Sequence, residues 1–210
     1  LCKQYDVIVV SDEIHCDLTK PGTEYIPFAS VDDTCRDISV TCIAPTKTFN
    51  LAGLQTAAVY AENSILHHRM WRQLNTDEVA EPNAFAIQAT IAAFQYGEEW
   101  LDELREYVEK NKQYVTEFLQ EKIPLIHPVA GDATYLMWLD CRKITESGRQ
   151  FVKFIRKTSG LYVSGGNQYG RGGGGFLRVN VATSKLVVED GMQRLYESVD
   201  AWLKEEKISK

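Results

Sequence analysis

Two side chains of opposite charge, Lys47 and Asp12, lie in short polar segments that each follow an apolar stretch of the sequence. A lysine amine can hold an aldehyde as a Schiff base, and a carboxylate can keep a neighbouring ring nitrogen protonated. A lone lysine in a loop is usually solvated, and a lone aspartate after a strand is usually a cap. Neither residue alone therefore indicates this chemistry, whereas the presence of both does.

The apolar stretches before these residues predict two neighbouring strands. Residues 7–10 (VIVV) are typical of a buried parallel strand whose carboxyl end carries functional residues, and Asp12 lies at that end. Residues 38–43 have the same character and lead through Pro45 into the segment that contains Lys47. Ligands of open α/β sheets bind outside the carboxyl ends of the strands. We therefore expect Asp12 and Lys47 at two adjacent strand ends.

A third candidate residue is Arg178, which follows a glycine-rich stretch at 165–175. Its planar guanidinium can bind a carboxylate through two parallel hydrogen bonds. The alternating apolar residues at 177–181 are equally compatible with an arginine on a solvated strand face. The glycine-rich stretch could also be a phosphate loop, but strand-like residues follow it, and it lacks the Gly-Lys-Ser or Gly-Lys-Thr ending of such loops.

Taken together, these segments resemble the fold type I family of pyridoxal phosphate enzymes, which includes the class I and II aminotransferases. The resemblance rests on SDEIH at 11–15, TKTFNLAGL at 46–54 and YGRGGGGFLRVNVA at 169–182, in family order over most of the chain. The first two motifs are most similar to the MalY/PatB group of cystathionine β-lyases, or C–S lyases. The resemblance implies an α/β, aminotransferase-like fold and pyridoxal 5'-phosphate as cofactor.

The resemblance also implies a role for five residues. Lys47 would bind the cofactor and then act as the catalytic base at the substrate's Cα. Asp12 would hold the protonated ring nitrogen, and the Thr46 hydroxyl would contact the phosphate. His15 stands where many aminotransferases of the family carry a tyrosine that binds the cofactor's phenolic oxygen; it could also be a local cap or a core histidine. Arg178 would bind the substrate's α-carboxylate.

Two positions depart from the family pattern around the phosphate. Many members carry an arginine eight residues after the lysine, where this sequence has Gln55. A serine that binds phosphate is frequent where this sequence has Ala44. A neutral hydroxyl such as that of Thr46 is a weaker phosphate ligand than a guanidinium. We expect the remaining phosphate ligands to come from outside this segment.

The family's N-terminal half supplies most of the large domain, so the resemblance implies that this chain is roughly the C-terminal half of a subunit. We expect residues 1–104 to be the C-terminal portion of the large cofactor-binding domain. Residues 105–210 would then form the small α/β domain. Active sites of this family lie at a homodimer interface, so the resemblance also implies a homodimer.

In the first of these regions we expect a strand at 55–61 and then three helices, at 63–74, 83–96 and 98–121. Asn83 follows Pro82 and is a candidate N-cap. Residues 84–94 are rich in alanine and apolar, which predicts a buried helix. In the second region we expect strands and helices to alternate, with strands at 127–129, 133–140, 161–163 and 176–181 and helices at 149–157 and 186–204.

Composition excludes several other classes of protein. The 210 residues are 44% hydrophobic and 25% charged, which is ordinary for a globular chain. A net charge of −6 without a basic patch argues against nucleic-acid binding. No apolar stretch is long enough to span a membrane, and no histidine or cysteine spacing predicts a metal site. Five cysteines without a Cys-x-x-Cys pair favour free thiols, so we expect a cytoplasmic protein.

Three functions are compatible with the resemblance. The first is a carbon–sulfur β-lyase, which removes a thiol from an amino acid substrate to give pyruvate and ammonia. The second is an aminotransferase, in which the same substrate carbanion is reprotonated on the cofactor instead. The third is a non-catalytic, aminotransferase-like regulatory domain. The similarity of the Asp12 and Lys47 motifs to the MalY/PatB lyases favours the first, although spacing alone does not separate them.

Overall fold

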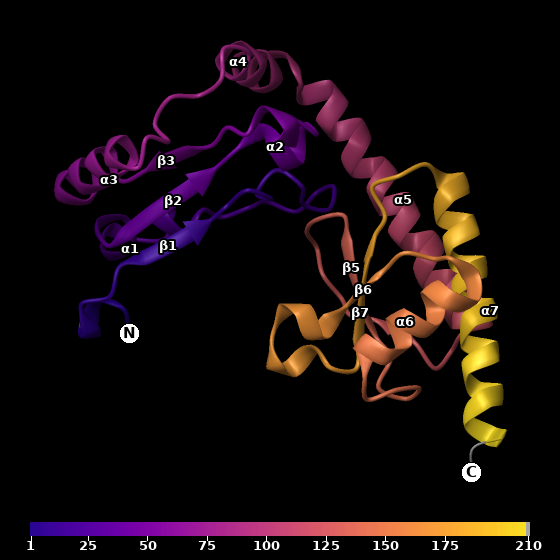
Figure 1. Cartoon of the computed structure of the whole chain (residues 1–210). Coiled ribbons are helices and arrows are strands. Elements are labelled where there is room, and N and C mark those ends of the chain that lie inside the picture. Colours follow the sequence, from indigo (N-terminus) through magenta and orange to yellow (C-terminus); the bar gives the residue numbers. More distant parts are fainter. Residues whose placement is uncertain (209–210) are drawn as a thin grey trace. The chain divides into compact units, whose positions relative to one another are not determined.

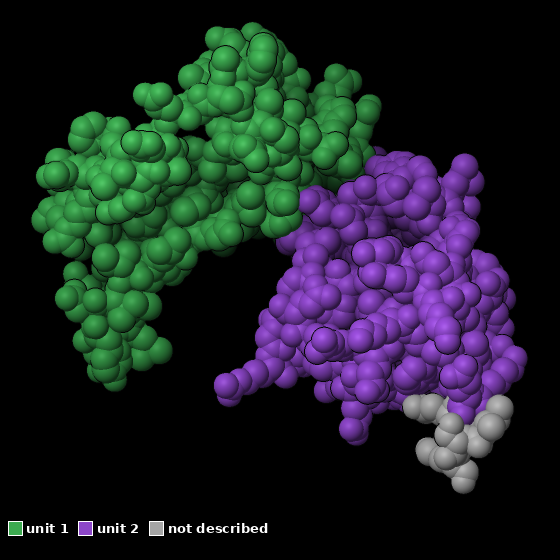
Figure 2. Space-filling model, viewed as in Figure 1, with its two compact units in different colours: residues 1–105 green, residues 106–210 purple. Residues whose placement is uncertain are grey.

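The structure is a computed structural model that describes residues 1–208, with side chains described as far as residue 205. The chain divides into two compact units, Leu1–Arg105 and Glu106–Lys210 (Figures 1 and 2). Both units combine strands and helices, so the expected α/β class is confirmed. Each unit is described separately below.

Unit 1 is built on a three-stranded sheet of order β1-β2-β3. β1 (Val9–Asp12) and β2 (Ser39–Ile43) are parallel, as expected, and β3 (Ala58–Tyr60) pairs antiparallel with β2. In the register of the parallel pair Asp12 lies opposite Cys42, so both strands end at nearly the same level. The connection between them contains η2 (Phe28–Ser30) and α1 (Asp33–Asp37), and η1 (Lys3–Tyr5) precedes β1.

The helices of unit 1 follow the sequence expectation closely. The short α2 (Pro45–Thr48) and η3 (Ala52–Leu54) come directly after β2, and three longer helices follow: α3 (Ser64–Thr76), α4 (Ala86–Tyr96) and α5 (Glu98–Lys122), the last of which continues into unit 2. The Asn83 side chain accepts hydrogen bonds from the backbone N–H groups of Phe85 and Ala86, so it caps the turn that leads into α4, although the N-cap of the helix itself is Phe85.

Two expectations about burial in unit 1 are wrong. Residues 7–10 were expected inside the sheet, yet the Val10 side chain is 66% exposed, and Val7 and Ile8 are about half exposed. The helix expected to be buried, α4, has only Ala86 buried. Residues 7–10 are all apolar and α4 is mostly apolar. The burial of β1 nevertheless alternates between half-buried and exposed residues. The apolar sequences of residues 7–10 and α4 therefore predicted burial, but no described residue covers most of these side chains.

Unit 2 contains an antiparallel sheet of order β4-β5-β7-β6, of which β5, β6 and β7 are labelled in Figure 1. Its strands are β4 (His127–Pro128), β5 (Leu136–Asp140), β6 (Ser164–Gly165) and β7 (Phe176–Asn180). The helices α6 (Gly148–Ser159) and α7 (Lys185–Ile208) pack against each other, and the glycine-rich stretch forms η4 (Gly166–Tyr169) and η5 (Arg171–Gly173). The core of the unit is aliphatic and aromatic, and its fully buried side chains include Leu119, Leu139, Phe151, Ile155, Leu177 and Leu195.

One strand of unit 2 lies later in the sequence than expected. Residues 161–163 were expected to form it, but the strand is β6, at Ser164–Gly165. Gly160 ends α6 with a φ of 71°, a left-handed conformation that glycine adopts without strain. The next residues serve as the connection from that helix end to the sheet. The glycine-rich stretch also leads through η4 and η5 into β7 rather than into a helix, so the structure agrees with the sequence argument against a phosphate loop.

Candidate active site

Asp12 is the last residue of β1 and is exposed. One of its carboxylate oxygens accepts a hydrogen bond from the backbone N–H of Ile14 at 3.2 Å. This contact holds the carboxylate over the turn that leaves the strand, which is the capping role expected of an aspartate at a strand end. The capping role uses one oxygen and leaves an exposed carboxylate at the carboxyl end of the sheet.

Glu13, which follows Asp12, anchors this end of the sheet, a role that no sequence pattern predicts. Only 4% of Glu13 is exposed. Its carboxylate accepts hydrogen bonds from the Ser11 hydroxyl at 2.9 Å and from the backbone N–H of Phe28 at 3.1 Å. Its own N–H donates to the Cys42 carbonyl at 2.9 Å. Burial, followed by the charge of Glu13, raises the pKa of the nearby Tyr25 phenol.

His15 lies in the turn that follows Asp12 and Glu13 and is half-buried. Its backbone carbonyl accepts a hydrogen bond from the N–H of Leu18 at 3.0 Å, which closes the turn. Burial and the carboxylates of Asp17 and Glu13 raise the pKa of the neighbouring Cys16 thiol to about 11. Cys16 is therefore a neutral thiol near neutral pH and a poor nucleophile.

Lys47 lies in α2, which starts two residues after the end of β2. Pro45 occupies the first turn of this helix, where its fixed φ favours a helical start. The Lys47 side chain is exposed and makes no hydrogen bond or ion pair with any described residue. The amine is therefore available to an external partner.

The turn that carries Lys47 is held on two sides. Thr48 is fully buried, and its hydroxyl donates a hydrogen bond to the Asp17 carboxylate at 3.0 Å. The Phe49 ring packs against Phe94, with ring centroids 5.6 Å apart, and against Trp100, with centroids 5.8 Å apart. The residues directly after Lys47 are therefore fixed, although its own side chain is not.

Thr46 and Gln55 complete the surroundings of Lys47 along the chain. Thr46 is half-buried in the first turn of α2, and its carbonyl accepts a hydrogen bond from the N–H of Leu51 at 3.0 Å. Gln55 is exposed, with a φ of 49°, at the end of η3. Ala44 is buried and immediately precedes α2. The described surroundings of Lys47 thus contain a hydroxyl at position 46 and an amide, not a cation, at position 55.

The structure brings four of the five predicted site residues to one end of one sheet. Asp12 ends β1, His15 lies in the turn after it, and Thr46 and Lys47 belong to the helix that follows the neighbouring parallel strand β2. The carboxyl ends of parallel strands share an edge, and functional residues gather there. The fifth residue, Arg178, belongs to unit 2.

Arg178 lies in the middle of β7, where it is paired with Trp138 of β5 and Ser164 of β6. Its guanidinium carbon lies 4.2 Å from the centroid of the Tyr169 ring. Burial raises the pKa of Tyr135, and the positive charge of Arg178 opposes that shift. Arg178 makes no ion pair with a described carboxylate, so its guanidinium can bind an external one.

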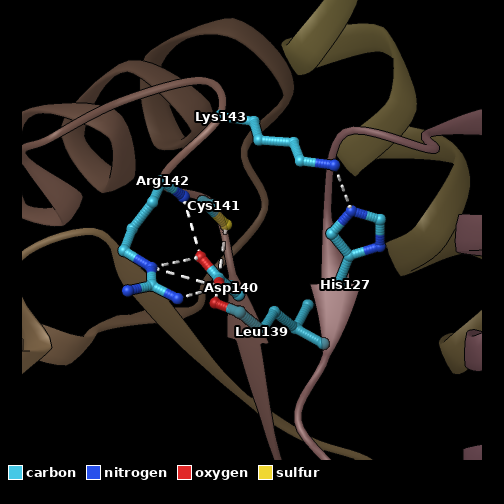
Figure 3. A network of polar contacts seen from close by, with 6 residues as sticks. All are labelled: His127, Leu139, Asp140, Cys141, Arg142 and Lys143. Atoms are coloured by element: carbon cyan, nitrogen blue, oxygen red, sulfur yellow. Dashed lines mark hydrogen bonds and ion pairs between the residues drawn. The ribbon is translucent and has the colours of Figure 1, made fainter.

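A separate polar network in unit 2 has a structural role (Figure 3). The Asp140 carboxylate accepts hydrogen bonds from Arg142 Nε at 3.0 and 3.1 Å and from Nη2 at 2.6 Å. These bonds lower the pKa of Asp140 to about 2. The Lys143 amine lies 2.9 Å from His127 Nε2, which joins the segment after β5 to β4. The network fixes the end of β5 and contains none of the predicted site residues.

In the described part of the chain, no cluster of three or more histidine, cysteine or acidic side chains is arranged to hold a metal ion. Among the described helices, none combines the length and the apolar character that a membrane crossing requires.

These features define a mixed α/β protein with a lysine and an aspartate at adjacent parallel strand ends. Residues 1–195 match the aminotransferase class I and II family, and the chain belongs to that family. The fold type I arrangement expected from the sequence is confirmed by the solved structures that the chain resembles.

Three relatives illustrate the similarity. Cystathionine beta-lyase PatB of Bacillus subtilis (strain 168) is 40% identical over 195 residues, which are 93% of this chain and 50% of that protein. Protein MalY of Escherichia coli (strain K12) is 30% identical over 202 residues, 96% of this chain and 51% of that one. The crystal structure of cystalysin from Treponema denticola, which contains a pyridoxal 5'-phosphate cofactor, matches with a TM-score of 0.91 and 28% identity, over 95% of this chain and 51% of that one. The chain thus spans about half the length of the curated relatives it matches.

Proposed function

We propose that this chain is part of a pyridoxal 5'-phosphate-dependent carbon–sulfur β-lyase, which removes a thiol from an amino acid and yields pyruvate and ammonia. The observation that carries the proposal is the free Lys47 amine on a fixed turn beside the strand that ends at Asp12, in a chain 40% identical to a cystathionine beta-lyase. The same residues in an unrelated sequence would support only an amine-based carbonyl chemistry.

The described residues fit this cofactor, because it requires an amine for its aldehyde and an acid for its ring nitrogen. Lys47 makes no bond with a described residue, and Asp12 exposes its carboxylate at the same end of the sheet. When bound, the cofactor supplies an electron sink for the carbanion that forms at the substrate's Cα.

Each residue then has a defined task. The Lys47 amine holds the cofactor and later takes the Cα proton of the substrate as a general base. Asp12 keeps the ring nitrogen protonated, since its carboxylate stabilises the adjacent positive charge. Thr46 offers a hydroxyl to the phosphate, and His15 offers a ring nitrogen to the phenolic oxygen.

Arg178 would bind the α-carboxylate of the amino acid, and the Tyr169 ring beneath its guanidinium supports that orientation. Gln55 and Ala44 cannot supply a charged phosphate ligand. The proposal therefore requires further phosphate ligands from residues outside this chain segment.

The proposal also covers the domain boundary, the oligomeric state and the cellular location of the protein. Unit 1 would be the C-terminal portion of the large cofactor-binding domain, and unit 2 the small domain, with the boundary near residue 105. A homodimer with its active site at the interface and a cytoplasmic location belong to the same proposal. The five cysteines are free thiols, which supports a reducing compartment.

An aminotransferase is the second candidate, since the family that matches residues 1–195 is named for that activity. The two reactions share the carbanion and differ in where the next proton or leaving group goes. A lyase gives pyruvate and a thiol without a second substrate, whereas an aminotransferase requires a keto acid.

The test is to incubate the full-length protein with pyridoxal 5'-phosphate and L-cystathionine, without a keto acid, and to follow pyruvate and free thiol. Equal amounts of both products would support the lyase. Amino transfer that occurs only after a keto acid is added would replace it with the aminotransferase. No reaction in either assay, with the cofactor bound, would contradict both. Lys47→Ala is the inactive control.

A further inference from the structure

A groove in unit 2 has a strongly basic lining. It has a volume of about 390 Å³ and lies between α6 and the segment 165–168, at the start of η4. α6 contributes four cations to it, and the opposite wall contributes two amides: Arg149, Lys153, Arg156, Lys157, Asn167 and Gln168. No acidic residue lines the groove. Its size is within the range of small-molecule sites, about 300–1,000 Å³.

The spacing of the four cations places them on one face of α6. Arg149, Lys153 and Lys157 are four residues apart in turn, and Arg156 is seven residues after Arg149, so all four project to the same side of the helix. Phe151 and Ile155 are fully buried on the opposite side. α6 contains no acidic residue. Like charges four residues apart on a helix repel one another, so this face is destabilising unless an anion covers it.

The other cations of unit 2 are mostly neutralised, in contrast to these four. Lys110, Arg142, Lys185, Arg194 and Lys204 each form an ion pair with a carboxylate. None of the four groove cations forms an ion pair with a described residue. The chain has 29 acidic and 23 basic residues, so carboxylates are abundant. Their absence from this groove is therefore not a consequence of composition.

One ring contact and one close approach to the backbone shape the walls of the groove before any ligand binds. The guanidinium carbon of Arg156 lies 3.5 Å from the centroid of the Tyr162 ring, a close cation–π contact. On the other wall, a Cβ at Gly165 would lie 2.7 Å from Asn167 Oδ1, so the absence of a side chain at 165 lets the amide lie against the backbone. A preformed pair of donors loses less entropy on binding than a mobile pair.

We propose that this groove binds a small anion with two or more phosphate groups. The residues from Arg149 to Lys157 span eight steps of about 1.5 Å, or about 12 Å along the helix, which is longer than one phosphate group. Guanidinium groups bind phosphate oxygens in pairs, lysines add positive charge, and amides add neutral donors. The groove contains none of the residues proposed for the lyase reaction, and the inference is independent of that reaction.

The test is isothermal titration calorimetry of the full-length holoenzyme with inorganic tripolyphosphate. The holoenzyme is used so that its cofactor already fills the phosphate position near Lys47. Saturable binding at one site per chain is expected, and it should weaken as salt rises from about 50 to 200 mM, because bound phosphates displace counterions. Binding of orthophosphate as tight as that of tripolyphosphate would overturn the inference, and so would binding to anionic vesicles without binding to tripolyphosphate.

Two double variants distinguish binding in the groove from a general effect of the protein's net charge. The double variant Arg149→Gln, Lys153→Gln should lose about tenfold or more in affinity, through the loss of two phosphate contacts. The matched control is Lys110→Gln, Lys204→Gln, which makes the same change of charge at cations of unit 2 that already have carboxylate partners. Equal losses in the two double variants would show a general charge effect and overturn the site.

A further variant, Tyr162→Ala, removes the contact with Arg156 without changing any charge. It should weaken tripolyphosphate binding several-fold while the salt dependence of binding stays the same. Unchanged affinity in Tyr162→Ala would show that Arg156 is not held in place for the ligand, and would contradict the preformed groove. Circular dichroism of each variant checks that the fold is retained.

Discussion

At the scale of single residues, the proposed chemistry depends on Lys47 and Asp12, two side chains that are more exposed than the residues next to them. Asp12 is exposed, whereas the next residue, Glu13, is buried and holds three segments together. The place of Asp12 after an apolar stretch predicts a functional role for it, whereas no pattern in the sequence predicts the role of Glu13. Two adjacent carboxylates look alike in a sequence, and only their hydrogen bonds separate the structural one from the reactive one.

Asp12→Asn should reduce turnover by about a hundredfold or more and leave the fold intact. An amide cannot hold a proton on the cofactor's ring nitrogen, so the ring becomes a weaker electron sink. The measurement is kcat for pyruvate release, with circular dichroism as the check of folding. Glu13→Gln is the comparison: it should lower stability more than Asp12→Asn does, since it alters a buried carboxylate with two donors.

The Asp140–Arg142 pair predicts a specific dependence of stability on pH. The bonded guanidinium lowers the pKa of Asp140 from 3.8 to about 2. The pair therefore stabilises the fold above about pH 4, and this contribution is lost as pH falls towards 2. Arg142→Gln should lower the free energy of unfolding slightly at pH 7, with the difference disappearing near pH 2. Urea unfolding over that pH range measures it, and a difference that does not change with pH would contradict the assignment.

At the scale of elements, the fixed turn of Lys47 is the most consequential feature that the sequence did not reveal. The contact between Thr48 and Asp17 links residues 31 positions apart, and no local pattern encodes it. Helices were easier to predict, since a period of 3.6 residues is local information. The strand expected at 161–163 was wrong because these residues connect the end of α6, capped by Gly160, to β6 at Ser164–Gly165.

Thr48→Val should destabilise the protein and loosen the Lys47 turn. Valine has nearly the same shape but no donor, which leaves the Asp17 carboxylate without this hydrogen bond, at a cost of about 1–3 kcal/mol. Thr48→Ser keeps the hydroxyl and should recover most of the loss. The measurements are urea unfolding and the dissociation constant for pyridoxal 5'-phosphate in full-length protein. Equal stability and equal cofactor affinity of the valine and serine variants would show that the hydrogen bond does not position the turn.

At the scale of the whole molecule, the proposed reaction uses both compact units. Lys47 and Asp12 belong to unit 1 and Arg178 to unit 2. The sequence supported the fold class and the order of these elements, because family motifs lie at both ends of the chain. It misjudged burial on β1 and α4, since burial depends on what covers a face and not on how apolar that face is.

Arg178→Ala should raise the KM for L-cystathionine by about tenfold or more, and cofactor affinity should stay nearly unchanged. The guanidinium is proposed to bind the substrate's carboxylate, and its loss removes a charge-assisted hydrogen bond. Steady-state kinetics and a cofactor titration give both values. Arg142→Ala, which removes another arginine of unit 2, is the control. A KM that stays the same in Arg178→Ala would remove this residue from the substrate site.

Reductive trapping of the bound cofactor shows whether Lys47 is the lysine that holds it. Full-length protein would be loaded with pyridoxal 5'-phosphate, reduced with borohydride, digested and analysed by mass spectrometry. The added cofactor mass is expected on Lys47, and it should be absent from the Lys47→Ala variant, which should still fold. Cofactor trapped on a different lysine of the wild-type protein, with Lys47 unmodified, would show that Lys47 is not the Schiff-base residue.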